Sequence, residues 1–98
     1  MKITTNKDGG ALNVKVSGRL DTTTAPELDE CLKGALDGVT DLTFDFTDLE
    51  YVSSAGLRVL LAAQKTMNEQ GSMKVTGVND IIMEIFEITG FTGILTIE

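Results

Sequence analysis

The sequence predicts a single α/β domain over residues 1–98, in which three to four helices pack against a small mixed β-sheet. Two observations support this prediction. Apolar residues alternate with period two in some segments and recur every three or four residues in others, in the order strand, strand, helix, strand, helix, strand, helix, strand. The 98 residues are enough for one hydrophobic core and too few for two. We expect the first strands to be antiparallel and the later ones to be parallel, joined by right-handed crossovers.

A turn signal separates the first two predicted strands. Asp8-Gly9-Gly10 lies between a short stretch containing Ile3 and the alternating apolar residues at positions 12, 14 and 16. Aspartate followed by glycine is typical of a tight turn, so these two stretches are expected to pair as an antiparallel hairpin.

The first helix is predicted to begin at Thr24. The segment Thr24-Ala25-Pro26-Glu27 has the spacing of a capping box, and proline is tolerated in the first turn of a helix. Gly38 supplies the stop signal. The apolar stripe between these signals is expected to face the core and consists of Leu28, Cys31, Leu32, Ala35 and Leu36.

A strand and a helix are predicted in the middle of the chain. Residues 42–46 alternate between apolar and polar side chains and form the clearest strand. A second helix extends from about Ser54 to Gly71, so that this region has the strand, loop, helix order of a crossover unit.

The C-terminal quarter of the chain is predicted to hold a strand, a helix and a last strand. Residues 73–75 form the first of these, Asn79 caps the helix and Gly90 ends it. The last strand is expected at Ile94, Leu95 and Ile97.

The composition excludes several classes of function. Fifteen acidic residues against eight basic ones give a net charge of -7, which disfavours direct nucleic-acid binding and favours a basic or polar protein partner. The chain has no histidine, which removes Ser-His-Asp and Cys-His catalysis and imidazole metal sites.

The same residues predict a cytoplasmic protein without a membrane span. Cys31 is the only cysteine and cannot close an internal disulfide, which is ordinary for a reducing compartment. The longest apolar run, Val59–Ala63, is far shorter than the roughly 20 residues that span a bilayer. Met1 and Lys2 lead into polar residues rather than into an apolar signal segment.

The most informative motif is Ser53-Ser54-Ala55-Gly56, which lies between a predicted strand and a predicted helix. A serine oxygen at such a junction can accept a hydrogen bond from the first free amides of the helix, so one of the two serines can simply be an N-cap. The same geometry also suits a phosphate, because the helix dipole favours negative charge and Ala55-Gly56 leaves room for an approaching enzyme.

Other chemistry at these positions is less well supported. A catalytic serine lacks both the glycine-flanked nucleophile elbow and a histidine base. Asp45, Asp48 and Glu50 lack the glycine-bearing spacing of a calcium loop and are expected to be solvated charges. We therefore expect no catalytic residue, no metal site and no cofactor.

Several segments together resemble the STAS domain family, the bacterial anti-sigma factor antagonists of the sporulation and stress-response type. The strongest is the run from Tyr51 to Leu61, with Ser-Ala-Gly-Leu at its helix start. Gly18-Arg19-Leu20-Asp21 precedes it, and the segment from Ile85 to Phe91 is similar to the late helix ending of the family. The resemblance covers nearly the whole chain.

The resemblance implies a non-catalytic regulatory protein that works by binding. In this family an unphosphorylated antagonist binds an anti-sigma factor that is also a serine kinase, and thereby frees the sigma factor. The kinase inactivates the antagonist by phosphorylating a serine, and a serine phosphatase reverses the modification. The acceptor of the family maps onto Ser54. Ser53 stands where the family usually has aspartate, and it is the second choice because it supplies an adjacent second hydroxyl.

The resemblance also implies a partner-binding surface at the loops beside that serine. Asp21 aligns with a family aspartate near the same surface. The predicted partner-binding residues are Asp21, Thr22, Thr23, Ser53, Ser54, Ala55, Gly56 and Arg58.

Two rival functions remain open. The first is an interaction or scaffold subunit of a larger signalling or lipid-transport assembly in which Ser54 is never modified, and Ser53 in place of the aspartate favours it. The second is a small enzyme that acts through Asp45 or a serine, which the missing histidine disfavours.

Overall fold

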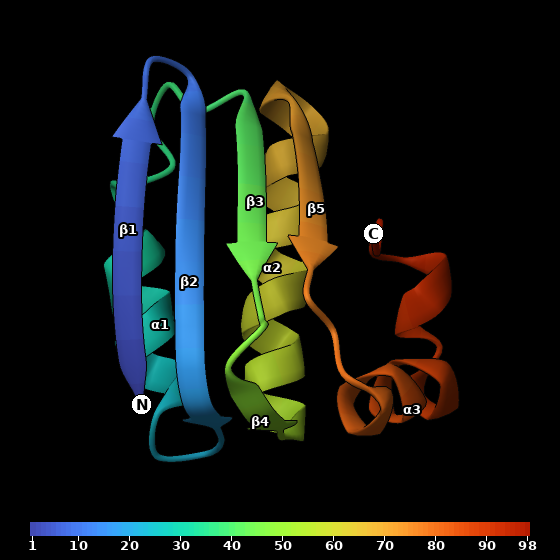
Figure 1. Ribbon diagram of the computed structural model, residues 1–98. Helices are drawn as coiled ribbons and strands as arrows, with labels where there is room; N and C mark the ends of the chain where they lie inside the picture. The colour runs from blue at the N-terminus through green and yellow to red at the C-terminus, as the bar shows by residue number, and fades with distance from the viewer.

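A computed structural model describes residues 1–98 and shows a five-stranded sheet with two helices on one of its faces and a third beside it (Figure 1). The elements in chain order are β1 (Lys2–Asp8), β2 (Ala11–Leu20), α1 (Ala25–Leu32), β3 (Asp41–Asp45), β4 (Leu49–Val52), α2 (Ser54–Gln70), β5 (Ser72–Thr76), α3 (Asp80–Thr89) and a 3-10 helix (Phe91–Gly93). None of the helices combines the length and the apolar content that crossing a membrane would require.

The sheet has the predicted mixture of directions. Its strand order is β1-β2-β3-β5, with β1 and β2 antiparallel and the other pairs parallel. The long strand β2 pairs with β3 along its first half and with β4 at its end, after an irregularity between Gly18 and Arg19. The α/β class and the antiparallel-then-parallel order are therefore confirmed.

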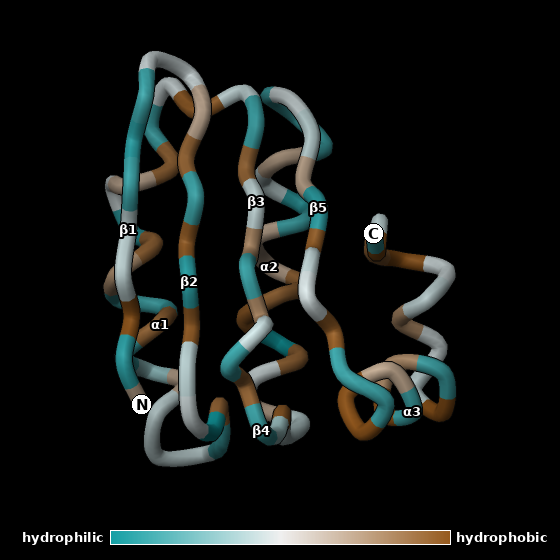
Figure 2. The backbone as a smooth tube through the Cα atoms, viewed as in Figure 1, coloured by the Kyte–Doolittle hydropathy of each residue, from teal (hydrophilic) through white to brown (hydrophobic).

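The core lies between the sheet and its helices, because the strands alternate as their sequences predicted. In β2 the buried residues are Leu12, Val14, Val16 and Leu20, and in β3 Leu42 and Phe44 are buried. Figure 1 shows α1 and α2 behind the sheet, and Figure 2 shows the alternation of apolar and polar residues along the strands. The opposite face of the sheet is polar and has no helix over it.

The first helix is shorter than predicted and begins differently. It ends at Leu32 rather than continuing to residue 36, because Gly34 adopts a positive φ of 77° that a helix does not contain. Leu36 is still buried, and the Gln70 side chain donates to its backbone oxygen at 2.6 Å. The predicted capping box is wrong, since Thr24 makes no side-chain cap and its hydroxyl donates instead to the Arg19 oxygen at 2.7 Å.

The second and third helices begin and end close to the predicted residues. Asn79 caps α3 by accepting from the Ile82 amide at 2.9 Å, and Gly90 ends it with a left-handed backbone. At the end of α2, Gly71 abuts the Thr40 carbonyl so closely that a Cβ would have no room there. The glycine thus permits the helix to turn directly into β5.

The predicted last strand is wrong. Residues 91–93 form a 3-10 turn, and only Ile97 then makes a single parallel bridge to Val75. Two glycines close together, Gly90 and Gly93, favour a turn over an extended strand in this segment. The structure also contains β4, which the sequence pattern did not predict.

Candidate functional site

Two loops that are far apart in the sequence meet at one edge of the sheet. β2 and β4 are parallel, with Leu20 opposite Val52, so both strands end at the same edge. The Ser53 amide donates to the Leu20 oxygen at 2.8 Å, which holds the two strand ends together. We call the turn 21–24 and residues 53–58 the junction surface.

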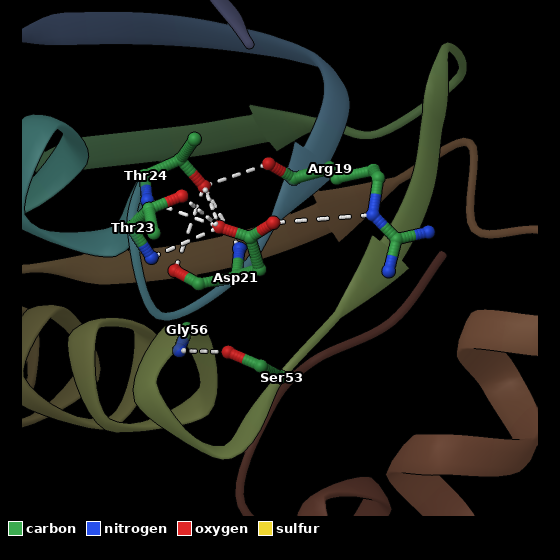
Figure 3. A network of polar contacts seen from close by, with 6 residues as sticks. All are labelled: Arg19, Asp21, Thr23, Thr24, Ser53 and Gly56. Atoms are coloured by element: carbon green, nitrogen blue, oxygen red, sulfur yellow. Dashed lines mark hydrogen bonds and ion pairs between the residues drawn. The ribbon is translucent and has the colours of Figure 1, made fainter.

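Ser53 is the N-cap of α2. Its backbone is extended, and its hydroxyl oxygen accepts a hydrogen bond from the Gly56 amide at 3.3 Å (Figure 3). The residue is half-buried. Aspartate and serine are about equally good N-caps, so Ser53 can do the capping that an aspartate would do at this position.

Ser54 is the first residue of α2 and lies in solvent. It is exposed, and its hydroxyl makes no hydrogen bond to the rest of the protein. Of the two adjacent serines, one is therefore used by the fold and the other is free.

Asp21 organises its own turn. One carboxylate oxygen accepts from the Thr23 hydroxyl at 2.8 Å and from the Thr23 and Thr24 amides at 3.0 and 3.1 Å. The Thr23 hydroxyl bond is the main cause that lowers the pKa of the carboxyl below its usual value, and the amide bonds act in the same direction. Figure 3 shows this cluster beside the Ser53–Gly56 bond, with no dashed line between the two groups.

Arg19 and Tyr51 border the same edge. The Arg19 guanidinium lies 4.5 Å from the centroid of the Tyr51 ring, and its Nε is 3.9 Å from the second Asp21 oxygen. An arginine over an aromatic face is a recognised attractive arrangement. The sequence analysis missed this pair because only the pairing of β2 with β4, with Arg19 opposite Tyr51, brings the two side chains together.

Gly56 is buried in the helix and faces inward. A Cβ there would lie 2.7 Å from the Leu20 Cγ and 3.0 Å from the Leu20 oxygen. The glycine thus lets the first turn of α2 pack directly on the end of β2, and this close approach positions Ser54 relative to the 21–24 turn.

The remaining predicted residues surround a shallow depression. Thr22, Ala55 and Arg58 line it from the two loops, and α1 completes it with Ala25, Pro26 and Asp29. Its volume is about 230 Å³. Thr23 is exposed but belongs to the Asp21 turn rather than to the lining. The structure thus brings most of the predicted partner-binding residues to one edge, with Gly56 buried beneath them.

The carboxylates on the polar side of the sheet serve other contacts. Asp45 accepts from the Thr47 hydroxyl at 2.6 Å, and Asp48 pairs with Lys15 at 3.2 Å. No three carboxylate or thiol groups in the chain come together in an arrangement that could hold a metal ion.

The free energy of unfolding is expected to fall in acid because of the carboxylates of Asp21 and Asp45. The Thr47 hydroxyl lowers the pKa of Asp45, as the Thr23 hydroxyl lowers that of Asp21, from a usual value of 3.8. As the pH falls, these two carboxylates therefore take up protons in the unfolded chain before they do so in the folded chain. Their contribution to stability is complete above the usual pKa and is lost as the pH falls through the lower pKa of the folded state. Urea denaturation at successive acidic pH values should show a shallower decline for the Asp21→Asn/Asp45→Asn variant. Asp8→Asn is the matched control, and an unchanged slope in the double variant would contradict the assignment.

Alanine at position 21 tests whether the turn depends on the carboxylate. Asp21→Ala removes the oxygen that accepts from the Thr23 hydroxyl and from the Thr23 and Thr24 amides, so we expect a lower free energy of unfolding in urea. Asp21→Asn keeps an oxygen in the same place and should retain most of the stability. If the alanine variant is as stable as the parent and binds its partner less well, Asp21 acts in docking and not in the turn.

Comparison with known proteins relates this arrangement to one family. The model of the family described as "Mlab, STAS domain" matches residues 3–96. The chain is 33% identical over 97 residues to the anti-sigma-B factor antagonist of Staphylococcus aureus (strain NCTC 8325 / PS 47), covering 97% of this chain and 90% of the relative.

Solved structures share the fold at lower identity. An anti-sigma factor antagonist from Mycobacterium paratuberculosis superposes with a TM-score of 0.88 at 23% identity, covering 98% of this chain and 83% of that one. The Bacillus cell fate determinant SpoIIAA in its phosphorylated form superposes with a TM-score of 0.77 at 14% identity, covering 99% and 91%.

Proposed function

Because this chain belongs to the STAS domain family, we propose that it is an anti-sigma factor antagonist, a regulatory protein that binds an anti-sigma factor and so releases a sigma factor. The observation that supports this most directly is the Ser54 hydroxyl, exposed and without a hydrogen-bond partner at the start of α2. The protein acts by docking in the cytoplasm, and no catalytic step is assigned to it.

The junction surface is the docking site in this proposal. It combines the exposed Thr22 and Thr23 of one loop with Ser54 and Arg58 of the other, and Thr22 and Arg58 line the shallow depression. Arg58 is exposed and forms no ion pair within the protein, so its charge is available to a partner. A kinase that recognises this surface would find the Ser54 hydroxyl within it.

Phosphorylation of Ser54 by the anti-sigma factor kinase is the proposed off switch, and a serine phosphatase reverses it. The phosphate adds about -1.5 to -2 charges at a helix N-terminus, where negative charge is tolerated, so the fold persists. Its charge and bulk oppose docking of the partner at the same place.

Arg58 gives the switch a second component. It follows Ser54 by four residues, a spacing at which side chains on a helix are neighbours, with Cβ atoms about 5–6 Å apart. A phosphate on Ser54 can therefore pair with the guanidinium, since phosphate and arginine form strong charge-assisted bonds. The modification would then also withdraw the arginine from the docking surface.

Intact-mass measurement tests the acceptor. The protein is incubated with a candidate anti-sigma factor kinase and ATP, and we expect the mass of a single phosphate to be added. Ser54→Ala should abolish the addition, and Ser53→Ala should leave it in place, because the Ser53 oxygen is engaged with the Gly56 amide. Addition to Ser54→Ala but not to Ser53→Ala would move the acceptor to Ser53.

The second candidate function is an unmodified scaffold subunit of a larger signalling or lipid-transport assembly. The serine at position 53, where the family usually has aspartate, favours it. It predicts no phosphate addition with any cognate kinase and unchanged docking by the Ser54→Asp variant.

A further inference from the structure

The third helix is firmly held on one side. Ile82 and Phe86 are fully buried, and the cap residue Asn79 donates from its amide to the Leu49 oxygen of β4 at 2.9 Å. Gly90 closes the other end. Its orientation relative to the sheet is therefore determined, and so is the side that it leaves uncovered.

The uncovered side carries an apolar ridge. Ile81 is 61% exposed and Ile88 is 77% exposed, and they are seven residues apart, which places them on one face two turns from each other. Ile85 lies between them and is half-buried. We call Ile81, Ile85 and Ile88 the α3 ridge.

Local preferences do not account for this ridge. Isoleucine is a weaker helix former than leucine, glutamate or lysine because its branched side chain is restricted against the preceding turn. Single exposed apolar residues are ordinary on protein surfaces, whereas apolar residues aligned on one helix face indicate a contact with another molecule.

The surroundings of the ridge are acidic. Asp80, Glu84 and Glu87 lie on the same helix and Glu50 lies on β4, against which α3 packs. All four are exposed and none forms an ion pair, and α3 contains no basic residue.

We propose that the α3 ridge docks an amphipathic helix of another protein whose apolar stripe is flanked by lysine or arginine. Apolar burial on the ridge and attraction to the surrounding carboxylates would act together in such a contact. A second copy of this chain is disfavoured, because α3 against α3 would oppose carboxylates with no basic residue between them. An anionic membrane is disfavoured for the same reason.

The α3 ridge is separate from the proposed phosphorylation site at Ser54. The α3 ridge shares no residue with the junction surface, so the proposal holds whether or not Ser54 is phosphorylated. It gives the domain a second contact, able to remain occupied while the first is released.

Two synthetic amphipathic peptides serve as probes. Both have leucines at helical spacing, and one fills the remaining positions with lysine while the other uses glutamate. Calorimetric titration of the full chain should show the leucine–lysine peptide binding roughly tenfold or more tightly than the leucine–glutamate peptide. Amide chemical shifts should change mainly in residues 80–94.

Variants separate this contact from general charge attraction. Ile81→Ser/Ile88→Ser should weaken the leucine–lysine peptide roughly tenfold, and Glu84→Gln/Glu87→Gln should weaken it and reduce its salt dependence. Asp8→Asn/Asp41→Asn, which removes two exposed charges elsewhere, is the matched control and should bind as the parent does.

The proposal fails if the isoleucine variant binds the leucine–lysine peptide with parental affinity, or if the leucine–glutamate peptide binds equally well. Sedimentation showing a dimer that Ile88→Ser dissociates would assign the ridge to a second copy instead. Binding of anionic phospholipid vesicles that is lost in the isoleucine variant would assign it to a lipid surface.

Discussion

Replacing Ser54 with aspartate is expected to weaken binding to a cognate anti-sigma factor by roughly tenfold or more, while the far-UV circular dichroism stays unchanged. The side chain is exposed and makes no hydrogen bond, so the fold loses nothing by the change. The carboxylate is tolerated at the start of a helix, and the effect arises at the interface, where a new charge must be desolvated or repelled. Calorimetric or fluorescence titration with the purified partner measures it.

The neighbouring serine offers a matched control for this result. Ser53→Asp introduces the same charge one residue earlier, where aspartate is a good N-cap and its oxygen can accept from the Gly56 amide as the serine oxygen does. We expect it to bind as the parent does. Ser54→Asn supplies similar size without charge. If Ser54→Asp and Ser54→Asn bind the partner with equal affinity, the charge is not the cause of the weaker binding. If Ser54→Asp binds as tightly as the parent, the proposed switch is refuted.

Valine in place of Gly56 is expected to lower the free energy of unfolding by about 3 kcal/mol and to abolish partner binding. Its first side-chain atom alone would lie 2.7 Å from the Leu20 Cγ, and the two further methyl groups increase the overlap. Relief of this overlap moves the start of α2 away from the end of β2, which separates Ser54 from the 21–24 turn. Urea denaturation measures the stability, and titration with the partner at a temperature where the variant is folded measures the binding.

Gly93→Val is the matched control for that experiment. A Cβ at Gly93 would meet no atom within 4 Å, so the same substitution should change stability by only about 0.5 kcal/mol or less and leave binding at the junction surface intact. If Gly56→Val has the same free energy of unfolding as the parent, the start of α2 can move without destabilising the protein. The proposed role of Gly56 in positioning Ser54 would then be wrong.

Local signals predicted most of the elements correctly. The turn at Asp8-Gly9-Gly10, the alternation in β3 and the caps Asn79 and Gly90 are properties of a few neighbouring residues, and each appears in the structure where the pattern placed it. The Ser53-Ser54 motif belongs to the same class, because an N-cap depends on residues within one helical turn.

The two elements that the sequence did not predict correctly, β4 and the C-terminal segment, have a different origin. β4 is only four residues long, with Leu49 and Val52 buried three residues apart, so it shows no period-two pattern. It is a strand because the end of β2 offers it a partner after the irregularity at Gly18. The C-terminal residues were predicted to be a strand from their apolar content, but the edge of β5 pairs with them only at Ile97.

By itself the sequence determined the class of the fold, the order of its helices and most of its strands, and which residues begin and end α2 and α3. Those features depend on backbone preferences and on apolar periodicity over a few residues. The tertiary structure alone decided that Asp21 and Ser53 share an edge and that Arg19 covers Tyr51. These depend on the parallel pairing of β2 with β4 and on the fit of Gly56 against Leu20, which join residues more than thirty positions apart.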